Sequence, residues 1–150
     1  IKKKVILRNP YSTRPWQHVL EALSGYLFLA VELNKKKQLH GEAFNFGPSN
    51  KVNKNVISLV KIMKKFWKNV DWSLNKSKSK KIFESNLLKL NSNKSKKILN
   101  WETILRFNEV SKMTIDWYKN YYSNKINMYN FSLEQIKYYQ ELLIKKKKIK

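Results

Sequence analysis

The fold is decided by one stretch, Asn9-Pro10-Tyr11-Ser12-Thr13-Arg14-Pro15-Trp16-Gln17-His18-Val19. Before it, residues 5–8, three of them apolar, predict a short buried strand, which gives way to a loop at Pro10. After it, apolar residues recur at helical spacing and predict a helix over residues 17–34. Because that helix is apolar on most sides, we expect it to be buried between layers. The stretch therefore connects a strand to a buried helix.

Strand and helix patterns alternate along the rest of the chain. The spacing of apolar residues predicts strands at 43–46, 70–74 and 86–90, and helices at 53–68, 92–99, 102–123 and 132–146. Ser92 and Ser132 stand at the expected starts of two of these helices, where serine is a good N-cap. This alternation indicates an α/β architecture.

The composition excludes several kinds of site. The 150 residues include no cysteine and two histidines, His18 and His40, so disulfides, thiolate–metal sites and a zinc site made of histidines alone are ruled out. An apolar content of 42% argues for a folded core. We find no signal-peptide pattern, and two glutamates interrupt the most apolar stretch, residues 19–33. We therefore expect a cytoplasmic protein without a membrane partner.

The net charge of +22 has two interpretations. Such a charge fits a nucleic acid or an anionic membrane as partner. However, only three of the 32 basic residues are arginines, and lysine, asparagine and isoleucine, which share A/T-rich codons, are all abundant. Nucleic-acid-binding proteins usually also use arginine, whose fork matches phosphate groups and guanine edges. We favour biased composition, also because Trp and Tyr fall on apolar helix faces away from the lysine clusters, and keep a basic nucleic-acid-binding module as the alternative.

The sequence contains no complete catalytic constellation. Its three glycines are too far apart for a dinucleotide-binding fingerprint, and we find no phosphate loop and no nucleophile–base pair. Tyr121 and Lys125 have the spacing of a Tyr-x-x-x-Lys pair, but lysine is so frequent that we interpret the pair as chance. In one interpretation Arg14 binds a diphosphate and Trp16 packs on a base or sugar. In the other, Arg14 forms a surface ion pair and Trp16 fills the core. The residues alone leave these two interpretations open.

The central stretch resembles a motif of the extended short-chain dehydrogenase/reductase family, Arg-Asp-aromatic-x-His-Val-x-Asp. Here it reads Arg14-Pro15-Trp16-Gln17-His18-Val19-Leu20-Glu21, with a proline and a glutamate in place of the two aspartates. The longer run over residues 8–27 is similar to the branch of the family that dehydrates CDP-glucose. Further segments resemble family motifs in the same order, at 43–48, 83–90, 92–101, 117–119 and 133–136.

Two departures from the family pattern stand out. Asn100 replaces a glycine before Trp101, and asparagine is the next best residue for a left-handed helix C-cap. Phe83 replaces a histidine, so any polar contact of that histidine is lost.

The resemblance implies an α/β fold that is the C-terminal substrate-binding part of such an enzyme, without its Rossmann half. NAD and the catalytic Tyr-x-x-x-Lys pair would belong to the N-terminal half. We therefore expect no catalytic, cofactor-binding or metal-binding residue here, and a fragment that is inactive alone. Residues 1–125 would bind the nucleotide sugar, and residues 126–150 would form a C-terminal helix and basic tail. The full-length enzyme would be a homo-oligomer that converts CDP-glucose to CDP-4-keto-6-deoxyglucose.

The resemblance also implies roles for single residues. Arg14 would contact the diphosphate, and Trp16 would shape the nucleotide pocket. Asn45 would face the cleft from a strand end, and Glu84 would accept hydrogen bonds from the ribose hydroxyls. His18 and Glu21 would support the turn from loop to helix rather than touch ligand. An alternative within the same fold is a dehydratase or epimerase for another nucleotide sugar, GDP-mannose or dTDP-glucose.

Overall fold

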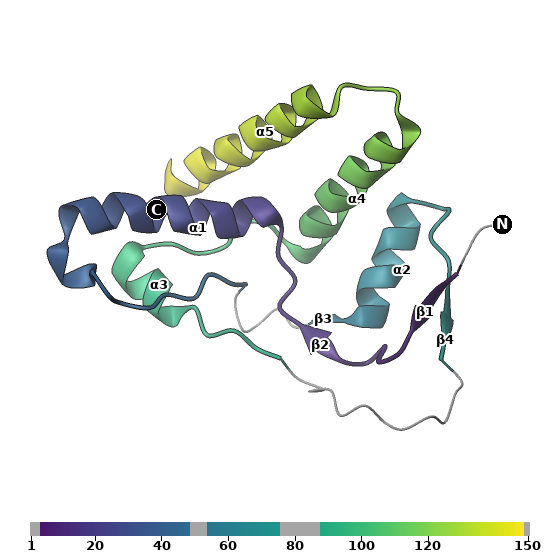
Figure 1. The fold of residues 1–150 in the computed structure, drawn as a ribbon, viewed down its shortest axis with the longest axis horizontal. Helices are drawn as coiled ribbons and strands as arrows, with labels where there is room; N and C mark the ends of the chain where they lie inside the picture. The colour runs from purple at the N-terminus through teal and green to yellow at the C-terminus, as the bar shows by residue number, and fades with distance from the viewer. Residues whose placement is uncertain (1–3, 49–53, 76–87, 149–150) are drawn as a thin grey trace.

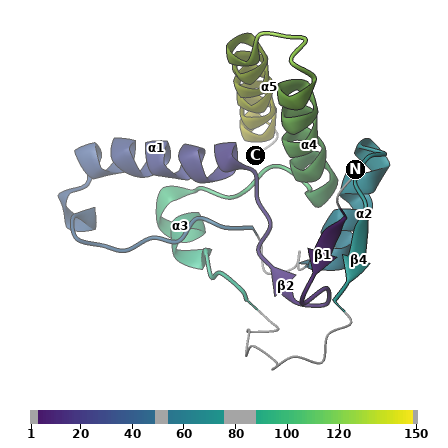
Figure 2. The ribbon, with the colours of Figure 1, turned by 45° about the vertical axis from the view of Figure 1, so that its right-hand side comes forward.

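Helices make up most of this protein (Figure 1), and a second view shows them set at several angles to one another (Figure 2). The computed structural model describes residues 4–48, 54–75 and 88–148. The expected mixture of strands and helices is confirmed, but the strands are few and short. In chain order the elements are β1 (Val5–Leu7), β2 (Thr13–Arg14), α1 (Val19–Lys35), the 3-10 helix η1 (Lys37–Leu39), β3 (Lys54–Asn55), α2 (Val56–Phe66), β4 (Trp72–Leu74), α3 (Asn93–Leu99), α4 (Phe107–Ser123) and α5 (Met128–Lys148).

The strands form two separate two-stranded sheets. β1 runs parallel to β4, and β2 runs antiparallel to β3. The strands predicted near residues 5–8 and 70–74 are therefore confirmed as β1 and β4. Within β1 only Leu7 is buried, since Val5 and Ile6 are 56% and 65% exposed. The prediction of a buried strand is thus wrong for most of β1, which among the described strands pairs with β4 alone.

Helix α1 is buried along one face only. Its buried residues are Glu21, Ser24 and Gly25, and Phe28 packs against the core from the same side. The opposite face is apolar and exposed, with Leu27 at 69%. The expectation that this helix lies between two layers is wrong in the part of the chain that the structure describes, because protein covers just one of its faces.

Two predicted helix starts are displaced. α4 begins at Phe107 and not at Glu102, because the backbone N–H groups of Ile104 and Leu105 donate to the buried carboxylate of Glu21 and so do not continue a helix. α5 begins at Met128, so Ser132 lies inside the helix, where its Oγ donates to the backbone oxygen of Met128. The predicted N-cap role of Ser132 is therefore wrong.

The segment at residues 43–46, predicted as a strand, forms no ladder among the described residues. Its burial nevertheless alternates, with Phe44 and Phe46 turned toward the core and Ala43 and Asn45 exposed. The strand predicted at 86–90 is also absent over its described part, residues 88–90, and its first two residues lie outside the described residues.

The main core lies between α1, α3 and the segment at residues 43–46. Its buried members are Leu39, Phe46, Leu99 and Trp101, with the rings of Phe46 and Trp101 edge to face at 4.9 Å. Asn100 turns the chain from α3 into Trp101 in the left-handed conformation, with φ 50°, as the C-cap argument predicted.

None of the described helices combines the length and the apolar character that a membrane crossing requires.

Candidate functional site

Strand β2 places two cations opposite each other. Arg14 and Lys54 are cross-strand partners in the antiparallel pair of β2 and β3. The Arg14 side chain is half-buried, and its Nη1 donates to the backbone oxygen of Thr13 at 2.7 Å. Like charges that face each other across a strand pair repel. The antiparallel register therefore places two basic residues side by side.

Trp16 is fixed beside this cation pair. Its indole Nε1 donates to the backbone oxygen of Lys54 at 2.9 Å, and its backbone N–H donates to the oxygen of Arg14 at 3.0 Å. The side chain is half-buried. Because the indole N–H is already used, the ring itself is what Trp16 can offer to a ligand.

Asn45 and Glu84 complete the predicted set of ligand contacts. The exposed amide of Asn45 donates to the backbone oxygen of Asn91 at 3.3 Å, which holds it toward the segment before α3. A hydrogen bond from Gln17 Nε2 to the oxygen of Phe46 joins the segment of Trp16 to the segment of Asn45. Glu84 lies outside the described residues, so its predicted contact with the ribose stays a prediction.

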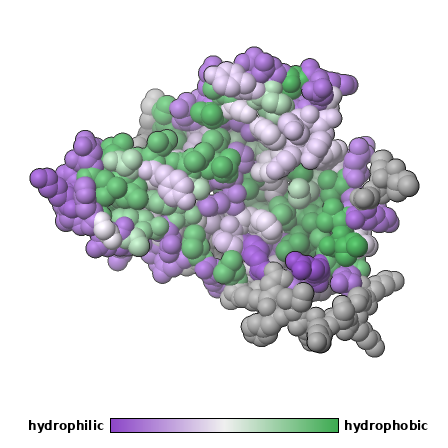
Figure 3. Space-filling view, in the orientation of Figure 1, coloured by the Kyte–Doolittle hydropathy of each residue, from purple (hydrophilic) through white to green (hydrophobic). Residues whose placement is uncertain are grey.

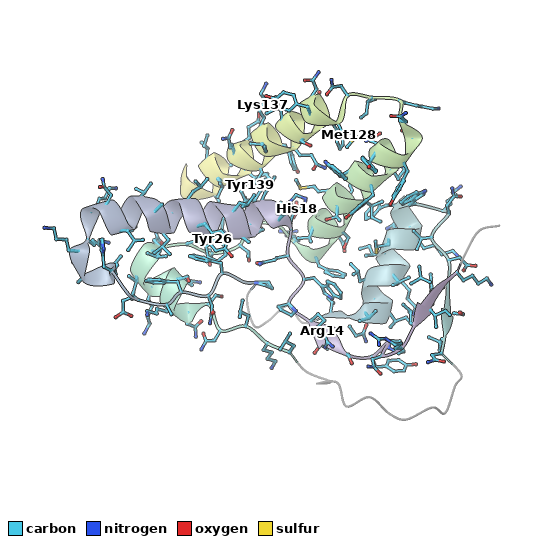
Figure 4. The ribbon with its side chains drawn as sticks, viewed as in Figure 1. Arg14, His18, Tyr26, Met128, Lys137 and Tyr139 are labelled. Atoms are coloured by element: carbon cyan, nitrogen blue, oxygen red, sulfur yellow. The ribbon has the colours of Figure 1, made fainter. Side chains whose placement is uncertain are left out.

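His18 lies at the other end of the connection from Arg14, at the start of α1 (Figure 4). Its ring is buried, and Nδ1 accepts a hydrogen bond from the backbone N–H of Leu20 at 3.3 Å. Burial lowers the pKa of His18, which favours the neutral ring. A neutral ring is the form in which Nδ1 can accept that bond, so His18 caps the helix.

Glu21 lies at a buried junction of three segments. Its side chain is 0% exposed, and its carboxylate accepts hydrogen bonds from the N–H groups of Ile104 and Leu105, at 3.0 and 2.7 Å, and from the Tyr139 hydroxyl at 3.0 Å. Burial raises the pKa of Glu21, and the bonds from Leu105 and Tyr139 oppose that rise. The carboxylate thus ties α1 to the loop before α4 and to α5.

Ser24 extends this junction. Its Oγ donates to the backbone oxygen of Glu21 at 2.8 Å and accepts from the Trp101 Nε1 at 2.9 Å. It also lies 3.0 Å from the Tyr139 hydroxyl, whose pKa burial raises. We call Glu21, Ser24, Trp101 and Tyr139 the buried joint. The sequence analysis missed all of it except Glu21, because no local pattern links Ser24 to a tyrosine 115 residues away.

A cavity of about 350 Å³ opens between the start of α1 and helices α4 and α5. His18 and Val19 line it from one side, Trp117 from α4, and Gln135 and Ile136 from α5. Its walls are mostly apolar side chains. The predicted ligand contacts Arg14, Trp16 and Asn45 do not line it, so this cavity and the cation pair of β2 are separate places.

The aromatic residues at the end of α4 form an exposed cluster. Trp117 and Tyr121 stack at 5.3 Å, and Tyr122 approaches Trp67 of the α2 C-terminus at 6.1 Å. The apolar spacing of residues 102–123 predicts that Tyr118 and Tyr121 face inward. That prediction is wrong, because Tyr118, Tyr121 and Tyr122 are 44%, 53% and 68% exposed. The buried residues of α4 are Val110, Ser111, Met113 and Ile115.

The Tyr-x-x-x-Lys spacing of Tyr121 and Lys125 has no helix to support it. α4 ends at Ser123, and Asn124 leaves the helix in the left-handed conformation, with φ 51°. The two side chains therefore do not share a helical face. Within residues 4–48, 54–75 and 88–148, no group of three or more histidines and carboxylates is placed to hold a metal ion.

Comparison with known proteins adds one relative. No protein-family model matches the chain. Over 65 residues, 43% of its length, the chain is 48% identical to the CDP-glucose 4,6-dehydratase of Salmonella typhimurium strain LT2. The match spans 18% of that enzyme, less than a fifth of its length. The chain thus contains a segment related to part of a dehydratase.

Proposed function

We propose that this chain is the nucleotide-sugar-binding part of a dehydratase and that it binds CDP-glucose. The observation that carries the proposal is the cross-strand pair of Arg14 and Lys54, of which Arg14 lies inside the stretch with the strongest family resemblance. Both side chains would attract a diphosphate placed there, and the guanidinium can bind it with two parallel hydrogen bonds. The relative with 48% identity is a CDP-glucose enzyme, which supports this choice of ligand.

The neighbouring residues take supporting parts in this proposal. Trp16 would offer its ring to the base or the sugar. Asn45 and Glu84 would contribute further contacts, Glu84 to the ribose hydroxyls. His18 and Glu21 would hold the start of α1 and thereby the strand connection that carries Arg14. The division into residues 1–125 and 126–150 falls between α4 and α5 and stays a prediction.

The chain would bind the nucleotide sugar and would contribute no catalytic residue. Its three glycines do not form the cluster that a bound dinucleotide requires, so these residues do not fit NAD, which would be held by another part of the enzyme. Anchoring the nucleotide far from the reacting sugar orients that sugar and so contributes to rate as well as affinity. We expect the chain alone to form no 4-keto sugar from CDP-glucose.

Titration calorimetry with CDP-glucose tests the site. Arg14→Ala should weaken binding by about 1.5–3 kcal/mol, the range for hydrogen bonds to charged groups, which is roughly 10- to 150-fold in Kd. The Kd of Arg14→Lys should lie between those of the unmodified chain and Arg14→Ala, because lysine keeps the charge but cannot form two parallel hydrogen bonds. Arg8→Ala is the matched control, since it removes the same charge from an exposed side chain next to β1 and should leave Kd unchanged.

The outcomes separate the proposal from its alternatives. Equal loss of affinity in Arg8→Ala and Arg14→Ala would indicate attraction by net charge and remove Arg14 from the site. Tighter binding of GDP-mannose or dTDP-glucose than of CDP-glucose would keep the fold and replace the substrate. An absence of saturable binding to all three would overturn the proposal.

The exposed aromatic cluster favours a second candidate, the binding of single-stranded nucleic acid. The argument against it was that the aromatic residues lie on apolar helix faces away from the lysine clusters. Tyr121 and Tyr122 are exposed, however, and Tyr122 approaches Trp67 at the lysine-rich end of α2 at 6.1 Å. Lysines 61, 64, 65 and 68, in and just after the neighbouring helix α2, are exposed. Stacked aromatic rings beside cations are the usual platform for unpaired bases.

A salt titration distinguishes this candidate. Binding of an oligonucleotide should weaken steeply between low and moderate salt, and Tyr122→Ala should weaken it further if bases stack on the cluster. Tyr129→Ala, which removes an equally exposed tyrosine at the start of α5, serves as the control. If both variants bind like the unmodified chain, the aromatic cluster is not a nucleic-acid site.

A further inference from the structure

The cavity of about 350 Å³ between the start of α1 and helices α4 and α5 has an uncharged wall. The described residues that line it include no lysine, arginine, aspartate or glutamate, although 28% of the chain is charged. His18 lines it too, and burial lowers the pKa of His18, which favours the neutral ring. Figure 3 shows hydrophobic surface gathered over α1, the helix whose first turn forms one side of the cavity. A charged ligand would lose its hydration here without gaining an ion pair, so the cavity favours an uncharged molecule.

Hydrogen bonds between α4 and α5 hold this wall in place. Trp117 Nε1 on α4 donates to the Ser132 Oγ on α5 at 3.0 Å. Gln135 Nε2 on α5 donates to the backbone oxygen of Met113 on α4 at 2.8 Å. The rings of Trp117 and Tyr118, which both line the cavity, meet edge to face at 5.4 Å. An aromatic wall is therefore already formed before any ligand enters, as in most small-molecule sites.

Gln17 brings an unsatisfied acceptor to the cavity. Its Oε1 is buried and has no hydrogen-bond partner among the described residues. Nε2 of the same amide donates to the backbone oxygen of Phe46 at 3.1 Å, so the amide cannot be turned round to exchange its two ends. A buried acceptor without a donor is costly, and a molecule that supplies the donor gains by binding. Because the Gln17 side chain is half-buried and lines the cavity, that donor can come from a molecule inside it.

His18 brings a donor to the same end of the cavity. Its Nδ1 accepts from the backbone N–H of Leu20, so the neutral ring carries its proton on Nε2. Within residues 4–48, 54–75 and 88–148, this Nε2–H meets no acceptor. Two adjacent residues thus offer one acceptor and one donor. A hydroxyl group is complementary to both, because it donates through its hydrogen and accepts through its oxygen.

We propose that this cavity binds a small, uncharged aromatic alcohol, whose hydroxyl group donates to Gln17 Oε1 and accepts from His18 Nε2. The rings of the ligand pack against Trp117 and the apolar side chain of Ile136. An apolar cavity of about 150 Å³ takes one benzene molecule, so 350 Å³ has room for two fused rings. This site goes beyond the proposed function, since the residues proposed to bind the nucleotide do not line the cavity.

Equilibrium dialysis with three naphthalene derivatives tests the chemistry of the site. We expect 2-naphthol to bind saturably, with one molecule per chain. Its methyl ether, 2-methoxynaphthalene, keeps the rings but cannot donate to Gln17, so it should bind roughly fivefold more weakly, the effect of one neutral hydrogen bond. The carboxylate 2-naphthoate should bind at least tenfold more weakly than 2-naphthol, because the cavity offers its charge no partner.

Three variants locate the bound molecule. Ile136→Trp fills the cavity and should abolish saturable binding of 2-naphthol. Ile144→Trp is the matched control, because it makes the same substitution on the same helix at a side chain that is 54% exposed and does not line the cavity. It should leave the Kd unchanged. Gln17→Met removes the acceptor, so it should lower the affinity for 2-naphthol to that for the methyl ether and leave the affinity for the ether unchanged.

Several results would overturn the proposal. Equal affinity for 2-naphthol and its methyl ether would remove the hydroxyl contact, and tighter binding of 2-naphthoate would indicate attraction by the net charge of +22. Equal loss of binding in Ile136→Trp and Ile144→Trp would indicate adsorption to exposed apolar surface. Saturating CDP-glucose should not displace 2-naphthol, and displacement would assign the cavity to the nucleotide. A chain that binds 2-naphthol as expected but fails to bind CDP-glucose would support this site and contradict the proposed function alone.

Discussion

The two faces of α1 invert the usual pattern of a surface helix. Most such helices bury an apolar stripe and expose polar residues. In α1 the buried face holds Glu21 and Ser24, whereas the exposed face holds valines, leucines and a tyrosine. The buried polar groups are satisfied within the chain, by donors from the loop before α4 and from α5. The exposed apolar groups lie open to solvent, although the ring of Tyr26 meets the ring of Phe46 edge to face at 5.5 Å.

This comparison separates the buried polar residues, which stabilise the fold, from the apolar residues of α1 that lie at the surface. The buried joint is a set of hydrogen bonds between distant segments, so substitution of its members should lower the stability of the fold. The exposed apolar side chains of α1 are not part of this set, so substitutions there should change the stability of the chain much less. Three substitutions on the inner side test this division.

The largest effect should come from Glu21→Ala. It leaves two backbone N–H groups and the Tyr139 hydroxyl without their buried acceptor. Unsatisfied buried donors are expensive, and we expect the free energy of unfolding to fall by about 4 kcal/mol in chemical denaturation. Glu32→Ala is the matched control, because Glu32 lies on the same helix and pairs with Lys36 at the surface. A loss for Glu21→Ala no larger than that of the control would contradict the central role of the joint.

A smaller effect is expected from Gly25→Ala, which crowds the contact between α1 and the core. An added Cβ would lie 2.3 Å from Cδ1 of Phe46, so the phenyl ring must move. Overpacking of this kind typically costs about 2 kcal/mol, measured by the same denaturation experiment. The double variant with Phe46→Leu should recover part of that loss, and a double variant as unstable as the sum of its parts would show that the two residues do not interact.

The smallest effect should be that of Glu21→Gln on the pH dependence of folding stability. Burial raises the pKa of Glu21 above its value in the unfolded chain, about 4.3, so the folded state keeps this proton to higher pH. Its contribution to stability is therefore largest below that pH and falls as pH rises through the folded pKa. Glu21→Gln does not titrate, so unfolding measured between pH 4 and 7 should show the unmodified chain losing stability relative to the variant. A constant difference across this range would mean that the pKa of Glu21 is not raised.

Helix content was predictable because its signals are local. The amphipathic spacing of residues 53–68 contains α2, and a serine followed by a short periodic run marks α3. The left-handed C-cap at Asn100 follows from residue chemistry at one position. The start of α4 was not predictable, because it depends on a carboxylate 83 residues earlier in the chain that takes the N–H group of Ile104.

The candidate site was predictable in part. Arg14 and Trp16 attract notice by residue type and by their place ahead of a helix. Lys54 does not, since it is one of many lysines and becomes special only through its register opposite Arg14. The joint of Ser24, Trp101 and Tyr139 left no local signal either, because its members come from three distant segments.

The sequence by itself determined which segments are helical, the turn at Asn100, and the resemblance that points to a nucleotide-sugar enzyme, because spacing and residue type are local properties. The tertiary structure alone decided which face of α1 is buried, which lysine stands beside Arg14, and that residues 43–46 form no ladder within the part of the chain that the structure describes. The physical reason is that burial and pairing are properties of contacts between distant segments, which local spacing and residue type do not record.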